Sequence, residues 1–154
     1  MINQDVIIEN TKQFVKSTLM SAEGGHDWFH VERVLKTAVY IAKKEKASLF
    51  TVKVGALIND NAHSKFHEGN EEIGPLIAEK FLKSQNISQS DLEHVINIIK
   101  YVSFKNSFDN TVFESIELEI IKDADRLDAI GAIGIARCFN YGGFKNRLIY
   151  DPDI

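Results

Sequence analysis

Side chains of the kinds that bind metal ions interrupt the apolar faces of three predicted helices. His30 shares a helix face with apolar residues, the pair Asn59–Asp60 follows an apolar run, and Asp125 lies within the apolar stripe of a third helix. A buried carboxylate is costly without a partner, so two carboxylates on separate helices imply a cation between them. Helical bundles build metal sites in this way, from side chains that project inward from facing helices. The pattern predicts a cation in the core, with candidate ligands at His30, Asn59–Asp60 and Asp125.

Each of these signals also has an ordinary explanation when it is taken alone. A single histidine on an apolar helix face is more often a hydrogen-bonded core residue than a metal ligand. A solvated helix face could instead account for Asp123, Asp125 and Asp128, paired with Lys122 and Arg126. The metal hypothesis rests on the three signals taken together, because each of the three predicted helices places a polar side chain on its inward-facing side.

The spacing of apolar residues predicts helices throughout the chain. Apolar residues recur mainly at i, i+3 and i+4, with only two prolines and nine glycines, so no sheet is required. Asp27 is a predicted N-cap, Pro75 fits a first helical turn, and Ser90 with Glu93 forms an S-x-x-E capping box before another helix. The predicted helices span about 5–22, 27–45, 49–62, 75–84, a segment from 90 onward, 116–130 and 134–140. The helices near 27–45, 49–62 and 116–130 are expected to pack against one another.

Length and cysteine content indicate how the chain is stabilised and in which compartment it is expected. At 154 residues with 44% hydrophobic composition, the chain is long enough to bury one core without disulfides or a structural metal. Cys138 is the only cysteine, which excludes an intramolecular disulfide and favours a reducing, cytoplasmic compartment. The first twenty residues contain no continuous apolar block of the kind that directs export or spans a membrane.

The charge pattern argues against binding to nucleic-acid polymers. The net charge is −4, and no run of lysine and arginine is interleaved with aromatic residues. A small phosphorylated substrate remains compatible with this charge, because a metal ion and a few basic side chains can neutralise it locally. A homodimer is also compatible with the sequence.

Two long motifs resemble those of the HD-domain metal-dependent phosphohydrolases. The run GGHDWFHVERV at 24–34 resembles the opening signature of that family, in which the histidine at the position of His30 supplies the first metal ligand. Asn59–Asp60 lies where the family places its His-Asp pair. The run DADRLDAIGAIGIAR at 123–137 is similar to the closing motif of a bacterial nucleotide pyrophosphohydrolase-like subgroup, with Asp125 as the last ligand. The resemblance covers the chain from about residue 20 onward.

The resemblance implies an all-α HD-domain bundle that hydrolyses a phosphate ester. The implied substrate is a nucleotide, in the first place a (deoxy)nucleoside triphosphate, or another small phosphate ester. The implied cofactor is a divalent ion (Mn, Mg, Fe, Ni or Zn), which would activate water and polarise a phosphoryl oxygen. Family members continue into further helices, so the chain is expected to be a single HD-type domain over 1–154 that lacks C-terminal helices.

Other polar residues near these motifs are candidates for catalysis or substrate binding. Lys65, Lys105 and Arg126 lie on or beside loops expected to rim the pocket, where they could neutralise a phosphate; each could equally be an exposed surface charge. His26 and Asp27 could orient ligands or shuttle a proton, although Asp27 could be only an N-cap. The predicted catalytic residues are Asp60, Lys65, His26, Asp27 and Arg126, and the predicted substrate contacts are His63, His67, Lys105 and Asp128.

The chain departs from the family pattern at two positions. Asn59 replaces a ligating histidine, and His63 stands where the subgroup has an acidic residue. The amide oxygen of Asn59, which we include among the predicted metal ligands, is weaker than imidazole for transition metals but acceptable to Mg²⁺. His63 could replace the missing imidazole if the helix continues, or face substrate or solvent. The alternatives to an active enzyme are a nucleotide-binding module with little or no turnover and a helical interaction domain.

Overall fold

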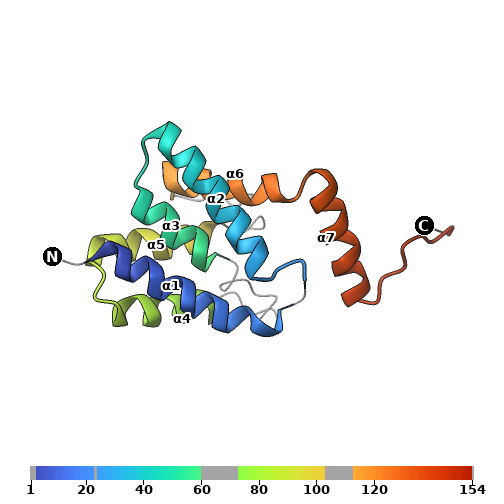
Figure 1. Cartoon of the computed structure of the whole chain (residues 1–154), viewed down its shortest axis with the longest axis horizontal. Helices are drawn as coiled ribbons and strands as arrows, with labels where there is room; N and C mark the ends of the chain where they lie inside the picture. Colours follow the sequence, from blue (N-terminus) through green and yellow to red (C-terminus); the bar gives the residue numbers. More distant parts are fainter. Residues whose placement is uncertain (1–2, 23, 60–72, 103–112, 154) are drawn as a thin grey trace.

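The computed structural model describes residues 3–22, 24–59, 73–102 and 113–153, and every regular element among them is helical (Figure 1). The predicted all-α class is confirmed. None of these helices is long and apolar enough to cross a membrane. The elements are α1 (Gln4–Thr18), the short 3-10 helix η1 (Leu19–Ser21), α2 (Trp28–Glu45), α3 (Leu49–Ile58), α4 (Ile73–Ser84), α5 (Gln89–Tyr101), α6 (Ile116–Asp128) and α7 (Gly131–Phe144).

Local capping explains where the helices begin. Asp27 caps α2 as predicted, since its side chain accepts a hydrogen bond from the backbone N–H of His30 at 3.0 Å. The predicted capping box at Ser90 is wrong, because Ser88 caps α5 two residues earlier. The backbone of Ser88 is extended at ψ 149°, and its Oγ accepts from the backbone N–H of Asp91 at 3.1 Å. The side chain of Glu93 instead accepts a hydrogen bond from Gln89 within the helix.

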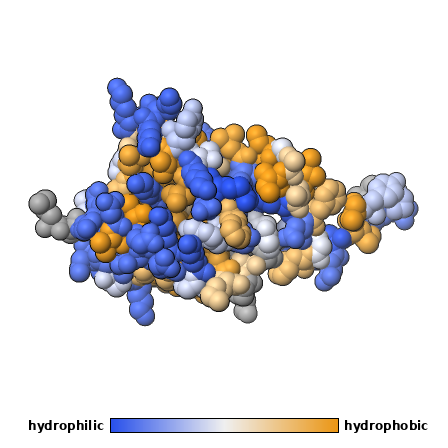
Figure 2. All heavy atoms as spheres, in the orientation of Figure 1, coloured by the Kyte–Doolittle hydropathy of each residue, from blue (hydrophilic) through white to orange (hydrophobic). Residues whose placement is uncertain are grey.

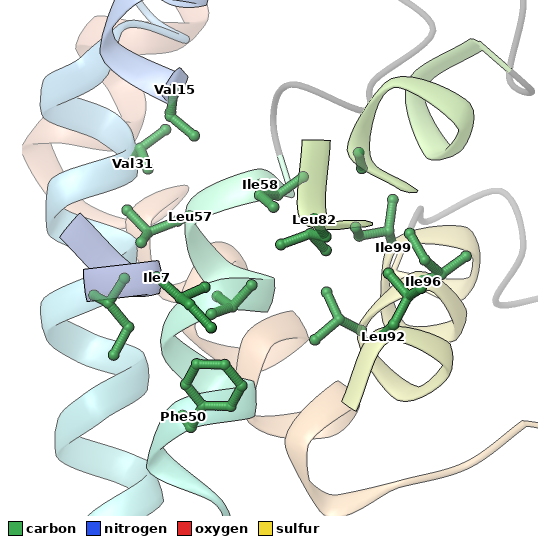
Figure 3. Packing of buried hydrophobic residues seen from close by; sticks show 14 of the residues in the cluster. Ile7, Val15, Val31, Phe50, Leu57, Ile58, Leu82, Leu92, Ile96 and Ile99 are labelled. Atoms are coloured by element: carbon green, nitrogen blue, oxygen red, sulfur yellow. The ribbon is translucent and has the colours of Figure 1, made fainter. Parts of the chain in front are cut away.

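Helix α3 is the centre of the fold. All of its residues from Phe50 to Ile58 are buried except Lys53, and they contribute to two apolar clusters. One cluster joins α3 to α1, α2, α4 and α5; Figure 3 shows Leu57 and Ile58 at its middle, with Leu82 on the side of α4. The second cluster joins α3 to α2, α5 and α6. The predicted mutual packing of α2, α3 and α6 is confirmed, so the three helices that carry the candidate ligands share one core.

A glycine allows α3 and α6 to approach closely. A Cβ atom on Gly55 would lie 2.7 Å from Cδ1 of Ile121 in α6. Such a distance is shorter than carbon atoms tolerate, so a side chain at this position would push the two helices apart or displace Ile121. The close contact packs α3, whose C-cap is Asn59, against α6, the helix that carries Asp125.

Helix α7 stands at one end of the molecule and is longer than predicted. It extends from Gly131 to Phe144, whereas the sequence predicted a short helix at 134–140. Its only buried residue within the described chain is Gly134. Leu127 of α6 is 49% exposed although it is apolar, because the buried row of α6 passes through Ala124 and Asp128. On the face drawn in Figure 2, hydrophobic residues gather over the α7 end of the molecule.

Gly134→Ala is expected to lower the free energy of unfolding by about 1–3 kcal/mol, the usual cost of overpacking. A Cβ atom at position 134 would collide with the backbone carbonyl of Ala129, which cannot move aside as a side chain can. Gly142→Ala is the matched control, because a Cβ there meets nothing within 4 Å, and alanine should favour the helix by up to about 1 kcal/mol. Urea unfolding of both variants measures the difference. A Gly134→Ala protein as stable as its parent would contradict the close contact between Gly134 and the backbone of Ala129.

Candidate metal centre

His30 occupies the first turn of α2 and points into the core, as the helical spacing predicted. It is 1% exposed. Its Nδ1 lies 2.7 Å from Oδ2 of Asp128, and its Nε2 lies 3.3 Å from Oδ1 of Asp125. Both carboxylates belong to α6, in which residues three apart share a face. The imidazole is therefore held between two carboxylates of one helix.

Asp128 is the most heavily bonded side chain of the site. Arg33 donates from Nε to Oδ1 at 2.7 Å and from Nη2 to Oδ2 at 2.9 Å, and Nη1 of Arg137 donates to Oδ2 at 2.9 Å. Burial alone would raise the pKa of Asp128, but hydrogen bonds from Arg33 and His30, together with their charges, outweigh burial and lower the pKa. The hydrogen bond to Asp128 also raises the pKa of Arg33. Asp128 is thus a carboxylate at neutral pH, held by two guanidinium groups.

Asp125 and Asn59 have the properties expected of ligands to a hard cation. The side chain of Asp125 is 37% exposed, and its Oδ1 faces Nε2 of His30. Asn59 ends α3 as its C-cap and is 3% exposed, and its buried Oδ1 has no hydrogen-bond partner within the described chain. Buried carbonyl oxygens are rarely left unpaired, and a bound cation is one of the ways to satisfy them. An imidazole nitrogen, an amide oxygen and a carboxylate oxygen form a donor set that fits a divalent ion.

The described residues supply only part of a ligand set. Over 3–22, 24–59, 73–102 and 113–153, no three side chains of histidine, cysteine, aspartate or glutamate are arranged to hold a metal ion. Asp60, the second carboxylate of the predicted ligand set, lies outside the described residues, and four further predicted site residues do as well. These four are His63, Lys65, His67 and Lys105.

The remaining predicted residues differ in their placement. His26 lies beside the site, with its ring centroid 6.0 Å from that of His30 and 5.6 Å from that of Tyr141 in α7. Asp27 acts as the N-cap of α2, which is the simpler of the two roles considered for it. Arg126 is 53% exposed and forms an ion pair with Asp123 at 3.8 Å, on the face of α6 that is turned away from Asp128. Its predicted catalytic role stays a prediction.

Two arginines of the site were not among the predicted residues. Arg33 follows His30 by three residues, so helical spacing alone could have placed it on the same face. Arg137 comes from another helix, and its Nε donates to the backbone carbonyl of Gly25 at 2.7 Å. No local pattern connects Arg137 to residues more than a hundred positions away. Its place at the end of the second long motif was the only available signal.

Comparison with known proteins matches this fold to one family. The HD domain family matches residues 28–130, which contain α2 through α6 and the carboxylates around His30. YpgQ of Bacillus subtilis (strain 168) is 38% identical over 148 residues, which cover 94% of this chain and 71% of that protein. A crystal structure of YpgQ in complex with ADP has a TM-score of 0.75 and 36% identity, and the match covers 95% of this chain and 73% of that chain.

Two other crystal structures are similar over almost the whole chain. A Lactobacillus plantarum protein has a TM-score of 0.86 and 33% identity, over 100% of this chain and 70% of that chain. An HD-superfamily hydrolase from Bacillus thuringiensis has a TM-score of 0.75 and 38% identity, over 99% of this chain and 73% of that chain. With its family match, its helical fold and the buried histidine held by carboxylates of α6, the chain belongs to the HD domain family.

Proposed function

We propose that the protein is a metal-dependent phosphohydrolase that acts on a nucleotide, with a (deoxy)nucleoside triphosphate as the expected substrate. The observation that carries the proposal is the setting of His30: a buried imidazole whose Nδ1 is held by Asp128 and whose Nε2 faces Asp125. Metal-ligating histidines characteristically donate their second ring N–H to a carboxylate in this way. The complex of the related YpgQ with ADP supports a nucleotide as the ligand.

The residues that would hold the divalent ion are His30, Asn59, Asp60 and Asp125. Of the ions Mn, Mg, Fe, Ni and Zn, the amide of Asn59 favours the harder ones, because imidazole and thiolate ligands select for softer metals. When bound, such an ion supplies Lewis-acid chemistry: it lowers the pKa of a water and polarises a phosphoryl oxygen. The protein's own contribution is to orient the ligands and to keep the ring of His30 in place.

The surrounding residues have proposed roles around the phosphate. The ring centroid of His26 lies 6.0 Å from that of His30, and His26 is the proposed proton carrier. Lys65, Lys105 and Arg126 are the proposed neutralising charges, and His63 and His67 the proposed substrate contacts. Asp128, predicted as a substrate contact, has its oxygens engaged by Arg33, Arg137 and His30, which favours an orienting role instead. A cytoplasmic location and a homodimer stay predictions from the sequence.

A second candidate function follows from Asn59. The loss of the family's imidazole at this position favours a module that binds a nucleotide and turns it over slowly or not at all. The two candidate functions use the same candidate site and differ in metal retention. A weakly held ion would leave nucleotide binding intact while hydrolysis fails.

The test is a hydrolysis assay of the purified protein with ATP and dATP in the presence of Mn²⁺ or Mg²⁺, together with metal analysis of the protein as purified. We expect a retained divalent metal, release of pyrophosphate, and loss of activity after chelation. Nucleotide-dependent thermal stabilisation without turnover would identify the binding module instead. If neither metal, turnover nor nucleotide stabilisation is found, both functions are wrong and a helical interaction domain remains.

A further inference from the structure

We propose that Arg137 of α7 is a positioning residue for His30: acting through Asp128, it holds the imidazole so that Nε2 faces Asp125. The consequence for hydrolysis rests on the proposed function, whereas the position of the ring is a property of the protein without metal. The proposal joins α7, which lies at the edge of the fold, to the residue at the centre of the candidate site.

The first step concerns the proton on the imidazole. Nδ1 of His30 lies 2.7 Å from Oδ2 of Asp128. An ionised carboxylate can only accept a hydrogen bond, so Nδ1 carries the proton and donates it. In the neutral ring the lone pair is then on Nε2, the atom that lies 3.3 Å from Oδ1 of Asp125. Asp128 therefore sets both the tautomer and the direction of the ring.

The second step concerns what holds Asp128. Arg33 binds both carboxylate oxygens from the side of α2, and Nη1 of Arg137 binds Oδ2 at 2.9 Å from the side of α7. The same Nη1 lies 3.2 Å from the backbone oxygen of Asp128, so Arg137 holds both the side chain and the end of α6. A guanidinium group suits this task because its donors form a rigid planar fork.

The third step concerns the other contacts of Arg137. Its Nε donates to the backbone carbonyl of Gly25 at 2.7 Å, in the loop that precedes α2, and its Nη2 lies 3.5 Å from Nε2 of His30. A guanidinium group has donors only, so it faces Nε2 favourably when that atom carries the lone pair. Its side chain is 15% exposed. One partly buried guanidinium thus contacts the loop before His30, the ring of His30 and the carboxylate that orients the ring.

Because of these contacts, the geometry of the site depends on how α7 packs against the rest of the fold. Gly134 is the one residue of α7 that is buried within the described chain, and Arg137 lies almost one turn beyond it. A shift of α7 therefore moves the guanidinium relative to Asp128. The ring of His30 would then be held less firmly in its orientation, even though its neighbours in α2 had not changed.

The test compares Arg137→Gln and Arg137→Lys with the parent protein, and Arg147→Gln is the matched control. Arg147 follows α7, lies over the ring of Tyr141 at 5.5 Å and is exposed. The first readout is the ring N–H proton of His30 in the metal-free protein, observed by NMR with ¹⁵N-labelled histidine. In the parent it should exchange slowly with water, and in Arg137→Gln it should broaden or exchange rapidly. In a further variant, Arg137→Ala, added guanidinium ion at millimolar concentration should partly restore the slow exchange of this proton.

The second readout is Mn²⁺ affinity by calorimetry, which should fall by about 10- to 100-fold in Arg137→Gln, as for other residues that orient a ligand. Arg137→Lys keeps the charge and the stem, so it guards against a variant that fails to fold; it should show the same loss in weaker form. Folded variants that keep both the slow ring proton and the parent's Mn²⁺ affinity would overturn the proposal. If the parent binds no Mn²⁺, the proposed function fails, and the ring proton alone decides the role of Arg137.

Discussion

Asp125→Ala is expected to abolish metal retention and to lower kcat/KM for nucleotide hydrolysis by more than about 100-fold, beyond the usual cost of losing a residue that only orients a ligand. Oδ1 of Asp125 lies 3.3 Å from Nε2 of His30, so removal of the carboxylate takes away the charge that would share a cation with the ring. The side chain is 37% exposed and adds little apolar burial. The free energy of unfolding without metal should therefore remain close to that of the parent.

The matched control for this variant is Asp123→Ala, two residues earlier in the sequence. Asp123 belongs to the same helix, has a side chain that is 61% exposed, and forms an ion pair with Arg126 at 3.8 Å. Exposed ion pairs of this kind contribute little to stability, so Asp123→Ala should keep metal and activity. Metal analysis after dialysis and steady-state kinetics of both variants give the comparison. An Asp125→Ala protein with full activity would show that the site lies elsewhere.

Asn59→His is expected to raise the affinity for Mn²⁺, Zn²⁺ or Fe²⁺ at least tenfold, or about 1.4 kcal/mol, and to raise hydrolysis with it. The physical reason is the buried Oδ1 of Asn59, which has no hydrogen-bond partner within the described chain and is a weaker ligand for these ions than imidazole. The gain should be much smaller with Mg²⁺, which prefers oxygen ligands. Added metal should also raise the Tm of the variant more than that of the parent, because binding to the native state alone favours folding.

Metal titrations of parent and variant, followed by a nucleotide-hydrolysis assay, measure this effect. Asn59→Ala is the companion variant, because it removes the amide oxygen without adding a nitrogen ligand and should weaken binding of every divalent ion. A parent that already binds Mn²⁺ tightly, with no change in Asn59→His, would show that the amide is an adequate ligand. In that case the proposed impairment of the site is wrong.

The sequence alone determined the helical class and the inward direction of His30. Both depend on local physics: the 3.6-residue period places His30 on the face of Val34, and the carboxylate of Asp27 caps the same helix within one turn. Interactions between residues three or four apart do not depend on the rest of the fold. The burial of Asn59 at the end of an apolar run followed from the same periodicity.

Errors at the helix ends have a local cause as well. Ser88 and Ser90 both lie ahead of the apolar run of α5, and only the backbone angles decide which of them caps the helix. Leu127 and Asp128 are neighbours in the sequence, so a rotation of α6 by a fraction of a turn decides which of them is buried. Packing against α2, with its guanidinium at Arg33, buries the carboxylate and leaves the leucine exposed.

Only the tertiary structure brought Arg137 into the site. It contacts Gly25 and His30, which precede it by 112 and 107 residues. Helical periodicity relates only residues a few positions apart. The contacts of Arg137 depend instead on the turn from α6 into α7 and on the packing of α2 against α6. The sequence therefore determined which residue types face inward on each helix, whereas the packing of the helices decided which carboxylate orients the imidazole and which one faces Nε2.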